Sequence, residues 1–226
     1  MTSQHPTRRQ LLRTAAAGAI SATAAGLLAA CTTPDRESRT VTTPTTPARS
    51  DSATTLLVYF SRAGENYWNG GRRTLDVGNT EILANLIRDR IDCDVYRVEA
   101  ADAYSDRYDP TVARNVDEQN SDARPAIARP LPDLSRYGRV LLGSPIWNVQ
   151  PPMIMASFAE NADLTGKDVH PFVTYAVSGL GNTASFYREL NTGARLHDDL
   201  AVRGEEVRDA SAGSDVDRWL RAAGLA

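Results

Sequence analysis

Residues 56–91, LLVYFSRAGENYWNGGRRTLDVGNTEILANLIRDRI, decide the fold of this chain. The apolar run 56–60 stops at the polar residues 61–64, and a helical pattern begins only after Gly78-Asn79-Thr80. A strand that is apolar on both faces is typical of a parallel sheet covered by helices. A turn that leads into a helix presents free backbone N–H groups, which commonly bind an anion such as a phosphate.

The composition bounds the class of protein. With 226 residues, of which 42% are hydrophobic, the chain fits one domain plus additional sequence. Its formal charge of −3 and its scattered basic residues argue against a nucleic-acid partner. The cysteines Cys31 and Cys93 and the histidines His5, His170 and His197 lack the spacing of metal ligands, so we expect no metal site.

The N-terminal segment, residues 1–30, is predicted to be a targeting peptide. Arg8-Arg9 precede leucines and an Ala-rich stretch, a pattern that resembles a twin-arginine export signal. The sequence LAAC at 28–31 resembles a lipoprotein cleavage box, which would make Cys31 the lipidated first residue. Together they predict an exported protein, lipid-anchored to the extracytoplasmic face of a bacterial cytoplasmic membrane. A chance Arg-Arg pair beside an N-terminal anchor helix, with an ordinary Cys31, remains the alternative.

Residues 31–53 are rich in Thr, Pro and Ser and have no apolar periodicity, which predicts a flexible tether. The folded domain is then expected at 54–226. A tether of this kind suits a domain that stands away from a membrane to which acyl chains on Cys31 bind it.

Apolar patterns from residue 54 onward alternate between strand and helix. Strands are expected at 56–60, 93–98, 140–143, 171–177 and 200–207, and the second of these alternates like an edge strand. Helices are expected after Gly78-Asn79-Thr80, around 110–119, after Pro151-Pro152, at 183–190 and at 216–223. Residues 65–77 are interpreted as an inserted loop. This order predicts an α/β fold with a doubly wound parallel sheet.

Polar loops follow three of the predicted strands, at residues 61–64, 144–148 and 178–182. In an open parallel sheet, ligands lie beyond the carboxyl ends of the strands. We therefore expect these loops, together with Gly78-Asn79-Thr80, to meet at one edge of the sheet.

The loop sequences YFSRAG…GNT, GSPIWN and SGLG occur in the order found in flavodoxin-like proteins, and residue 54 to the C-terminus resembles that family. The resemblance is to a branch with an insertion before Gly-Asn-Thr. It implies a five-stranded sheet of order 2-1-3-4-5 that binds flavin mononucleotide (FMN). A receiver-type signalling domain is disfavoured because Ser61 and Ser144 occupy places where it needs acidic residues.

The resemblance also implies a set of FMN-binding residues in the three loops. They are Ser61, Arg62, Ala63, Asn79 and Thr80 for the phosphate, Pro145, Ile146, Trp147 and Asn148 beside the isoalloxazine, and Tyr175, Ser178, Gly179 and Gly181 along the flavin edge or its pyrimidine side. Hydrogen bonds to a charged phosphate contribute about 1.5–3 kcal/mol each, so several can hold a dianion. Stacking on a flat aromatic ring contributes about 0.5–1.5 kcal/mol beyond burial.

Several of these residues have a second interpretation. Arg62 either compensates phosphate charge or faces solvent, and Trp147 could be a core or rim residue. Tyr67 and Trp68 either cover the site or form an exposed partner contact. Ser178 fits a turn or hydrogen-bonding role better than a nucleophile, because no G-x-S-x-G surrounds it, which disfavours a serine hydrolase.

These observations favour an FMN-binding redox protein. It could be an electron carrier with a redox partner, or an NAD(P)H-dependent quinone or flavin reductase. The chain has no G-x-G-x-x-G, so a reductase would bind nicotinamide only transiently against the flavin. The alternative is a flavodoxin-fold binding domain that has lost its flavin.

Overall fold

The computed structural model describes residues 54–190 and 192–226. The predicted targeting peptide, the tether and Cys31 lie outside these residues. In the described part of the chain, no helix is both long enough and apolar enough to cross a membrane.

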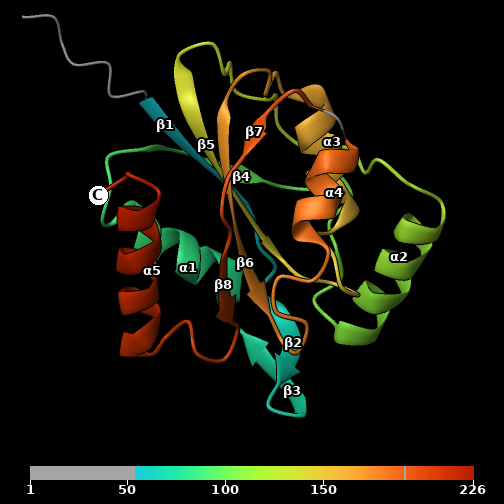
Figure 1. Ribbon diagram of the computed structural model, residues 1–226. Helices are drawn as coiled ribbons and strands as arrows, with labels where there is room; N and C mark the ends of the chain where they lie inside the picture. Colours follow the sequence, from blue (N-terminus) through green and yellow to red (C-terminus); the bar gives the residue numbers. More distant parts are fainter. Residues whose placement is uncertain (1–53, 191) are drawn as a thin grey trace, which may run out of the picture. The chain divides into compact units, whose positions relative to one another are not determined.

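The centre of the domain is a sheet of six strands, all paired in parallel (Figure 1). Its order is β4-β1-β5-β6, with both β7 and β8 paired to β6. The strands are β1 (Thr54–Phe60), β4 (Asp94–Val98), β5 (Tyr137–Pro145), β6 (Asp168–Tyr175), β7 (Arg195–Leu196) and β8 (Leu200–Arg203). The expected α/β class with a parallel central sheet is confirmed, and β4 lies at an edge as predicted.

The expected five strands in the order 2-1-3-4-5 require correction at the last position. Two short strands lie there: β7 pairs with Asp168 and Val169, and β8 pairs with the far end of β6, from Phe172 to Tyr175. The polar residues His197-Asp198-Asp199 separate them. A two-residue strand has no apolar run, so its sequence gave no sign of it. The predicted strand 200–207 also ends early, at Arg203.

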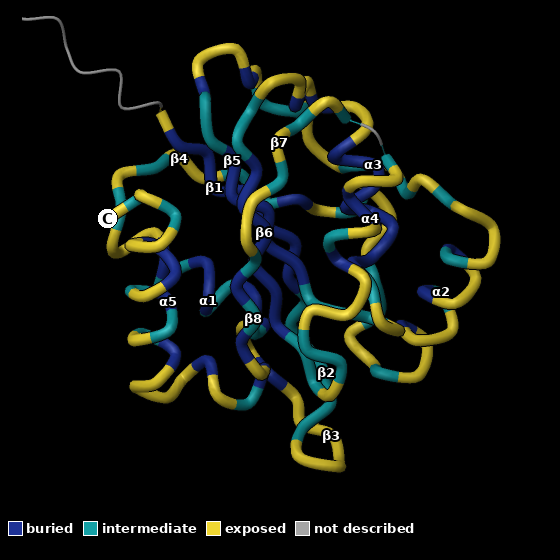
Figure 2. Tube along the Cα trace, in the orientation of Figure 1, coloured by how far each residue is buried: buried dark blue, intermediate teal, exposed yellow. Residues whose placement is uncertain are grey.

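Helices cover both faces of the sheet (Figure 1). One face carries α1 (Asn79–Arg88) and α5 (Ala210–Ala222), and the other carries α2 (Tyr108–Asn120), α3 (Met153–Asn161) and α4 (Thr183–Glu189). Strand β1 serves both faces: Leu57 packs in one apolar cluster, and Leu56 and Val58 pack in the other. Each fully buried side chain of this size contributes about 1.5–3 kcal/mol, so the central strands anchor both layers (Figure 2).

The predicted loop at residues 65–77 is instead a β-hairpin. Strands β2 (Gly64–Trp68) and β3 (Gly71–Leu75) pair antiparallel and form a separate two-stranded sheet. The turn residues Asn69 and Gly70 both have positive φ, of 47° and 86°, which is the conformation that favours Asn-Gly in tight hairpins. The Asn-Gly pair was the sequence sign of this hairpin.

Helix α5 begins at Ala210, six residues before its predicted start. In its first turns only Ala212 is buried, whereas Val216, Trp219 and Leu220 form the apolar stripe farther along. The pattern therefore marked only the part of the helix that packs on the sheet.

Candidate functional site

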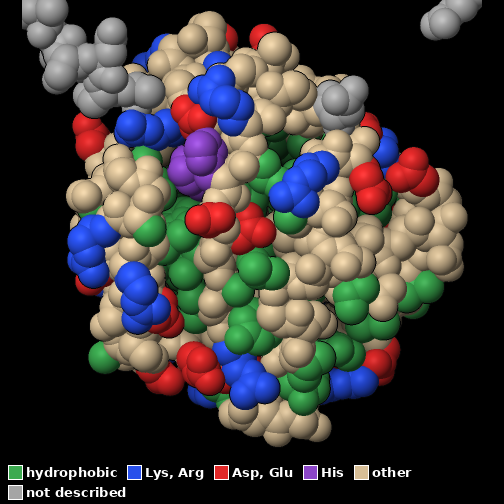
Figure 3. Space-filling model, in the orientation of Figure 1, with side chains coloured by type: hydrophobic (Ala, Val, Ile, Leu, Met, Phe, Trp, Pro, Cys, Tyr) green, Lys and Arg blue, Asp and Glu red, His purple; other side chains and the backbone are tan. Residues whose placement is uncertain are grey.

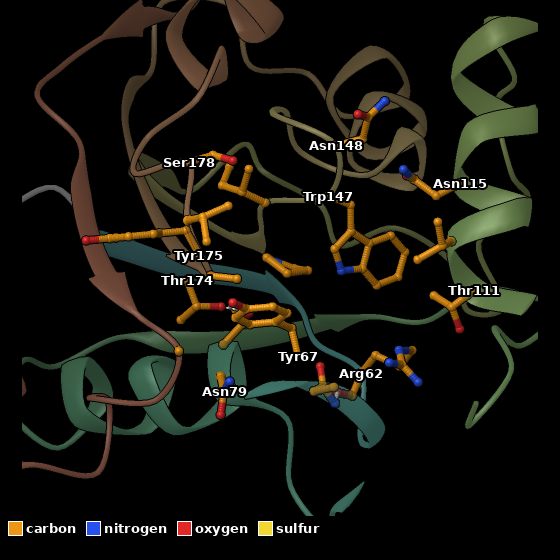
Figure 4. A pocket seen from close by; sticks show the side chains of 18 of the residues that line it. Arg62, Tyr67, Asn79, Thr111, Asn115, Trp147, Asn148, Thr174, Tyr175 and Ser178 are labelled. Atoms are coloured by element: carbon orange, nitrogen blue, oxygen red, sulfur yellow. Dashed lines mark hydrogen bonds between the residues drawn. The ribbon is translucent and has the colours of Figure 1, made fainter. Parts of the chain in front are cut away.

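A cavity of about 470 Å³ opens at the carboxyl ends of β1, β5 and β6 (Figure 4). Its walls come from the loops after these strands, from the start of α1, from the hairpin and α2, and from the turn after β8. The three polar loops therefore meet at one edge of the sheet, as expected.

The structure brings most of the predicted residues together. The predicted residues that line the cavity are Ser61, Arg62, Asn79, Thr80, Pro145, Ile146, Trp147, Asn148, Tyr175 and Ser178. Ala63, Gly179 and Gly181 do not line it. Gly181 has a φ of 52°, and a Cβ there would overlap the carbonyl oxygen of Val149, so this glycine permits the contact between two loops.

The end of β1 and the start of α1 are held in close contact. Ser61 is 6% exposed, and its Oγ accepts a hydrogen bond of 3.1 Å from the backbone N–H of Glu81, in the first turn of α1. A Cβ on Gly78 would overlap Ser61 Oγ. Glycine is therefore required at the start of Gly-Asn-Thr for close approach. The helix dipole and first-turn N–H groups make this end of the cavity attractive to an anion.

Two predicted phosphate ligands have protein partners. The Thr80 and Thr174 hydroxyl oxygens lie 2.7 Å apart and are hydrogen-bonded, and Thr80 is almost fully buried. Asn79 Oδ1 accepts a hydrogen bond of 2.7 Å from Arg208, which leaves the amide NH₂ to donate. Sequence reasoning missed both Thr174 and Arg208, which come from distant parts of the chain.

Arg62 does not simply face solvent. Its guanidinium donates to the carbonyl oxygens of Ser105, at 2.9 Å, and of Glu65, while Nε is buried without a partner in the described part of the chain. It forms no ion pair with a carboxylate of residues 54–190 or 192–226. Burial lowers the Arg62 pKa, yet an arginine stays protonated in proteins. Among the described residues, the Arg62 guanidinium thus forms hydrogen bonds only with carbonyl oxygens, while the nearby carboxylates of Asp106 and Glu65 offset part of its charge without forming an ion pair.

Trp147 forms the aromatic wall of the cavity. Its ring meets Phe60 and Tyr104 edge to face, with centroid distances of 5.5 Å and 5.2 Å. Part of the residue remains accessible, so Trp147 is both a rim packing residue and a flat surface for a ligand.

The turn after Trp147 is tight and strained. Asn148 and Val149 both have positive φ, of 47° and 66°, and the second value is unfavourable for a β-branched residue. Gln119 on α2 stabilises the turn by donating to the Trp147 carbonyl oxygen and accepting from the Asn148 amide. Strain of this kind is concentrated at functional sites.

The β2–β3 hairpin forms one wall of the cavity, and it settles the open question of whether Tyr67 and Trp68 cover the site. Tyr67 lies among the cavity side chains in Figure 4, whereas Trp68 does not line the cavity and stacks under Arg73 instead. On one side Arg72 pairs with Asp109 of α2 through two hydrogen bonds of 2.9 and 2.6 Å. On the other side Glu205 accepts from the backbone N–H of Asn69.

Helix α2 contributes a second unpredicted wall, made by Tyr108, Thr111, Val112 and Asn115. The apolar pattern of residues 99–137 is weak, so the sequence did not predict that this helix would line the cavity. The one available sign was polar residues at 108, 111 and 115, which share a face of a helix. Thr111 donates to backbone carbonyl oxygens, but Asn115 Oδ1 is buried and has no hydrogen-bond partner within the described ranges.

A smaller cavity, of about 240 Å³, lies near the opposite end of β6. The rings of His170 and His197, which are far apart in the sequence, stack there with their centroids 4.5 Å apart (histidine side chains are purple in Figure 3). Burial lowers the pKa of His170 to about 4. Hydrogen bonds from Arg195 and His197 lower the pKa of Asp168 to about 2. The described residues contain no group of three or more His, Cys, Asp or Glu placed to hold a metal ion.

Comparison with known proteins gives the family. The sequence profile of the family described as flavodoxin matches residues 75–221. The chain belongs to the flavodoxin family. A search of curated proteins found no match.

Solved structures agree with this flavodoxin assignment. A candidate flavoprotein from Bacteroides eggerthii superposes with a TM-score of 0.62 at 24% identity, over 77% of this chain and 99% of that one. One from Bacteroides uniformis gives 0.59 at 25% identity, over 75% and 98%. A flavoprotein from Lactobacillus acidophilus, solved in complex with FMN, gives 0.52 at 20% identity, over 74% and 99%. These similarities show that the flavodoxin fold extends over most of the chain.

Proposed function

We propose that this flavodoxin binds FMN in the 470 Å³ cavity and acts as a redox protein. One observation carries the proposal: a single cavity joins the unpaired positive charge of Arg62 and the start of α1 to the flat wall of Trp147. FMN has the matching parts, a dianionic phosphate and a flat heterocycle. The Lactobacillus acidophilus flavoprotein, which was solved with FMN, supports this choice.

The phosphate would be held at the α1 end of the cavity. Arg62 supplies the charge, and the Asn79 amide NH₂ and first-turn backbone N–H groups supply donors. Ser61 and Thr80 position this end of the site through their bonds to Glu81 and Thr174. Ser61 Oγ only accepts from Glu81, so its O–H can still donate to the phosphate, whereas the Thr80 hydroxyl is buried against Thr174 and is assigned mainly to maintaining the shape of the site.

The flat part of the cofactor would lie against Trp147, with Tyr67 of the hairpin and Tyr175 as further aromatic walls. Bound FMN supplies one- or two-electron chemistry. The protein groups bind it, orient it and exclude water from its faces. The hairpin is held by hydrogen bonds to Asp109 of α2 and to Glu205, and it would restrict access of other molecules to the bound flavin.

The proposal covers both an electron carrier and a reductase that uses NAD(P)H transiently. Anaerobic addition of NADH and then NADPH to the FMN-loaded protein separates them. Rapid bleaching of the oxidised flavin band by either nucleotide indicates a reductase. An unchanged band, with reduction by dithionite, indicates a carrier.

Titration of the full-length apoprotein with FMN tests cofactor binding. We expect saturable quenching of flavin fluorescence and a shifted flavin absorbance band. A colourless protein that takes up no FMN would overturn the proposal and favour a flavodoxin-fold binding domain without flavin.

We also propose export by the twin-arginine route and anchoring through Cys31, on the basis of residues 8–13 and 28–31. That route carries folded proteins, so FMN could bind before export. Replacing Arg8 and Arg9 together with Lys should leave the protein in the cytoplasm, and Cys31→Ala should release it from the membrane fraction. Unchanged membrane delivery of both variants would refute this part of the proposal.

A further inference from the structure

Asn115 is an unusual side chain in the cavity wall. It is 3% exposed, lies on α2 and lines the cavity, and Figure 4 shows its side chain pointing from the helix toward Trp147. Its Oδ1 is buried and accepts no hydrogen bond from any residue in the described part of the chain. A buried polar group without a partner costs about 1–3 kcal/mol of folding free energy. Asn115 therefore destabilises the protein when no ligand is bound.

Other amide side chains of the cavity differ from Asn115 in this respect. Asn66 donates to the Gly64 carbonyl oxygen at 3.0 Å, Asn79 accepts from Arg208, and Asn148 donates to Gln119 at 2.7 Å. Each of these amides has at least one hydrogen-bond partner in the protein. The Asn115 Oδ1, which accepts no hydrogen bond within the described ranges, is available to a ligand.

The surroundings of Asn115 indicate which part of a ligand it meets. A side-chain amide has an acceptor and a donor next to each other in one plane. Its complement is a planar edge with an N–H beside a C=O, as in the imide of the isoalloxazine pyrimidine ring. The neighbouring walls, Trp147 and Val112, suit a flat and mostly apolar body. Figure 4 shows Arg62 well apart from Asn115, so the phosphate would lie elsewhere.

We infer that Asn115 is a specificity-determining residue that hydrogen-bonds the imide edge of the flavin ring through both groups of its amide. The inference rests on the proposed FMN function. It assigns α2, rather than only the 175–178 loop, to recognition of the pyrimidine side of the ring.

The substitution Asn115→Leu separates ligand recognition from structure. Leucine has nearly the same volume and removes the unpaired polar group, so we expect the full-length apoprotein to unfold at the same or a higher temperature. We expect FMN affinity to fall about 10- to 100-fold, since two hydrogen bonds are lost and the ring imide stays unpaired. Asn161→Leu is the control, because Asn161 on α3 bonds Ser157 outside the cavity.

A cofactor analogue tests the contact itself. FMN methylated at N3 has no imide N–H, so the wild-type protein should bind it at least tenfold more weakly than FMN. Asn115→Leu should bind the two flavins with similar affinity. This comparison holds even if the variant is less stable than expected, because both titrations use the same folded protein.

The possible outcomes are distinct. Equal FMN affinity in Asn115→Leu and wild type would overturn the inference, and so would an undiminished preference for FMN over its N3-methyl analogue in the variant. Failure of the wild-type protein to bind FMN would instead contradict the proposed function.

Discussion

The two cavities at opposite ends of β6 each contain a basic side chain whose pKa is lowered by burial. They differ in whether that side chain is charged at pH 7. At the amino end, burial lowers the pKa of His170 to about 4, so the ring is neutral at pH 7. At the carboxyl end, burial also lowers the pKa of Arg62, but a guanidinium does not lose its proton in the physiological range. The first cavity therefore holds a neutral ring, whereas the second keeps a positive charge that forms no ion pair with a described residue and can attract an anion.

The nearby carboxylates show the same contrast. Asp168, at the amino end, accepts hydrogen bonds of 2.8 and 3.0 Å from Arg195 and one of 2.8 Å from His197. Arg62 has only carbonyl oxygens as partners in the described ranges. Paired charges indicate a structural role, and the unpaired charge identifies the binding end of the sheet.

The largest effect is expected for Arg62→Gln. It should weaken FMN binding about 100-fold, because a charge-assisted contact to phosphate contributes about 1.5–3 kcal/mol. Riboflavin, which has no phosphate, should bind wild type and variant alike in fluorescence titrations. Arg139→Gln, at the amino-end cavity, is the matched control and should leave FMN affinity unchanged. An equal loss for riboflavin would show that Arg62 does not act on the phosphate.

A smaller effect is expected at the other end, for His170→Gln. The unfolded chain binds a proton on this histidine with a pKa near 6.5, and the native protein only with a pKa near 4. Protonation therefore favours the unfolded state, and stability is lost as the pH falls from 6.5 to 4. Urea unfolding at pH 7 and 4.5 should show that the variant loses about 2 kcal/mol less than wild type. Parallel losses would mean that His170 is not buried as a neutral ring.

Trp147→Ala should weaken FMN binding about tenfold and change the flavin absorbance band, because a stacking surface is lost. Trp68→Ala should leave both unchanged, since Trp68 lies under Arg73 on the hairpin and outside the cavity. Isothermal titration and absorbance spectra measure the two effects. Identical behaviour of the two variants would contradict the assignment of Trp147 as the aromatic wall.

The smallest effect is expected for Asp168→Asn. The pKa of Asp168 is lowered to about 2, so its ionised form stabilises the fold above the unfolded pKa near 3.8, and this contribution disappears as the pH falls toward 2. Because the ion pair is partly exposed, we expect a loss of only about 1 kcal/mol at pH 7, measured by urea unfolding. FMN affinity should not change. A large drop in affinity would mean that the two cavities are coupled.

Much of the fold could be predicted from local sequence. The apolar runs of β1, β5 and β6 and the periodic apolar stripe of α1 were enough to predict these elements. A buried strand or helix needs apolar residues at a fixed period, which can be seen in the sequence. The two-residue strand β7 and the first turns of α5 have no such pattern. The hairpin was missed because β2 and β3 are only partly buried and rich in polar residues.

The candidate site divides in the same way. Ser61, Asn79, Trp147 and Ser178 were found because they directly follow strands or begin a helix. Asn115 and Thr174 were not assigned to it, and the role of Tyr67 was left open, because the sequence of an element does not show which cavity a polar side chain within it faces.

The sequence by itself determined that a parallel sheet would bring three polar loops together at one edge, since strand direction fixes where loops emerge. Only the tertiary structure decided which polar groups in that edge are left without partners. Pairing depends on contacts between residues far apart in the chain: Thr80 meets Thr174, Arg208 meets Asn79, and Arg62 reaches Ser105. What those contacts leave unpaired, the charge of Arg62 and the amide of Asn115, is what a ligand can recognise.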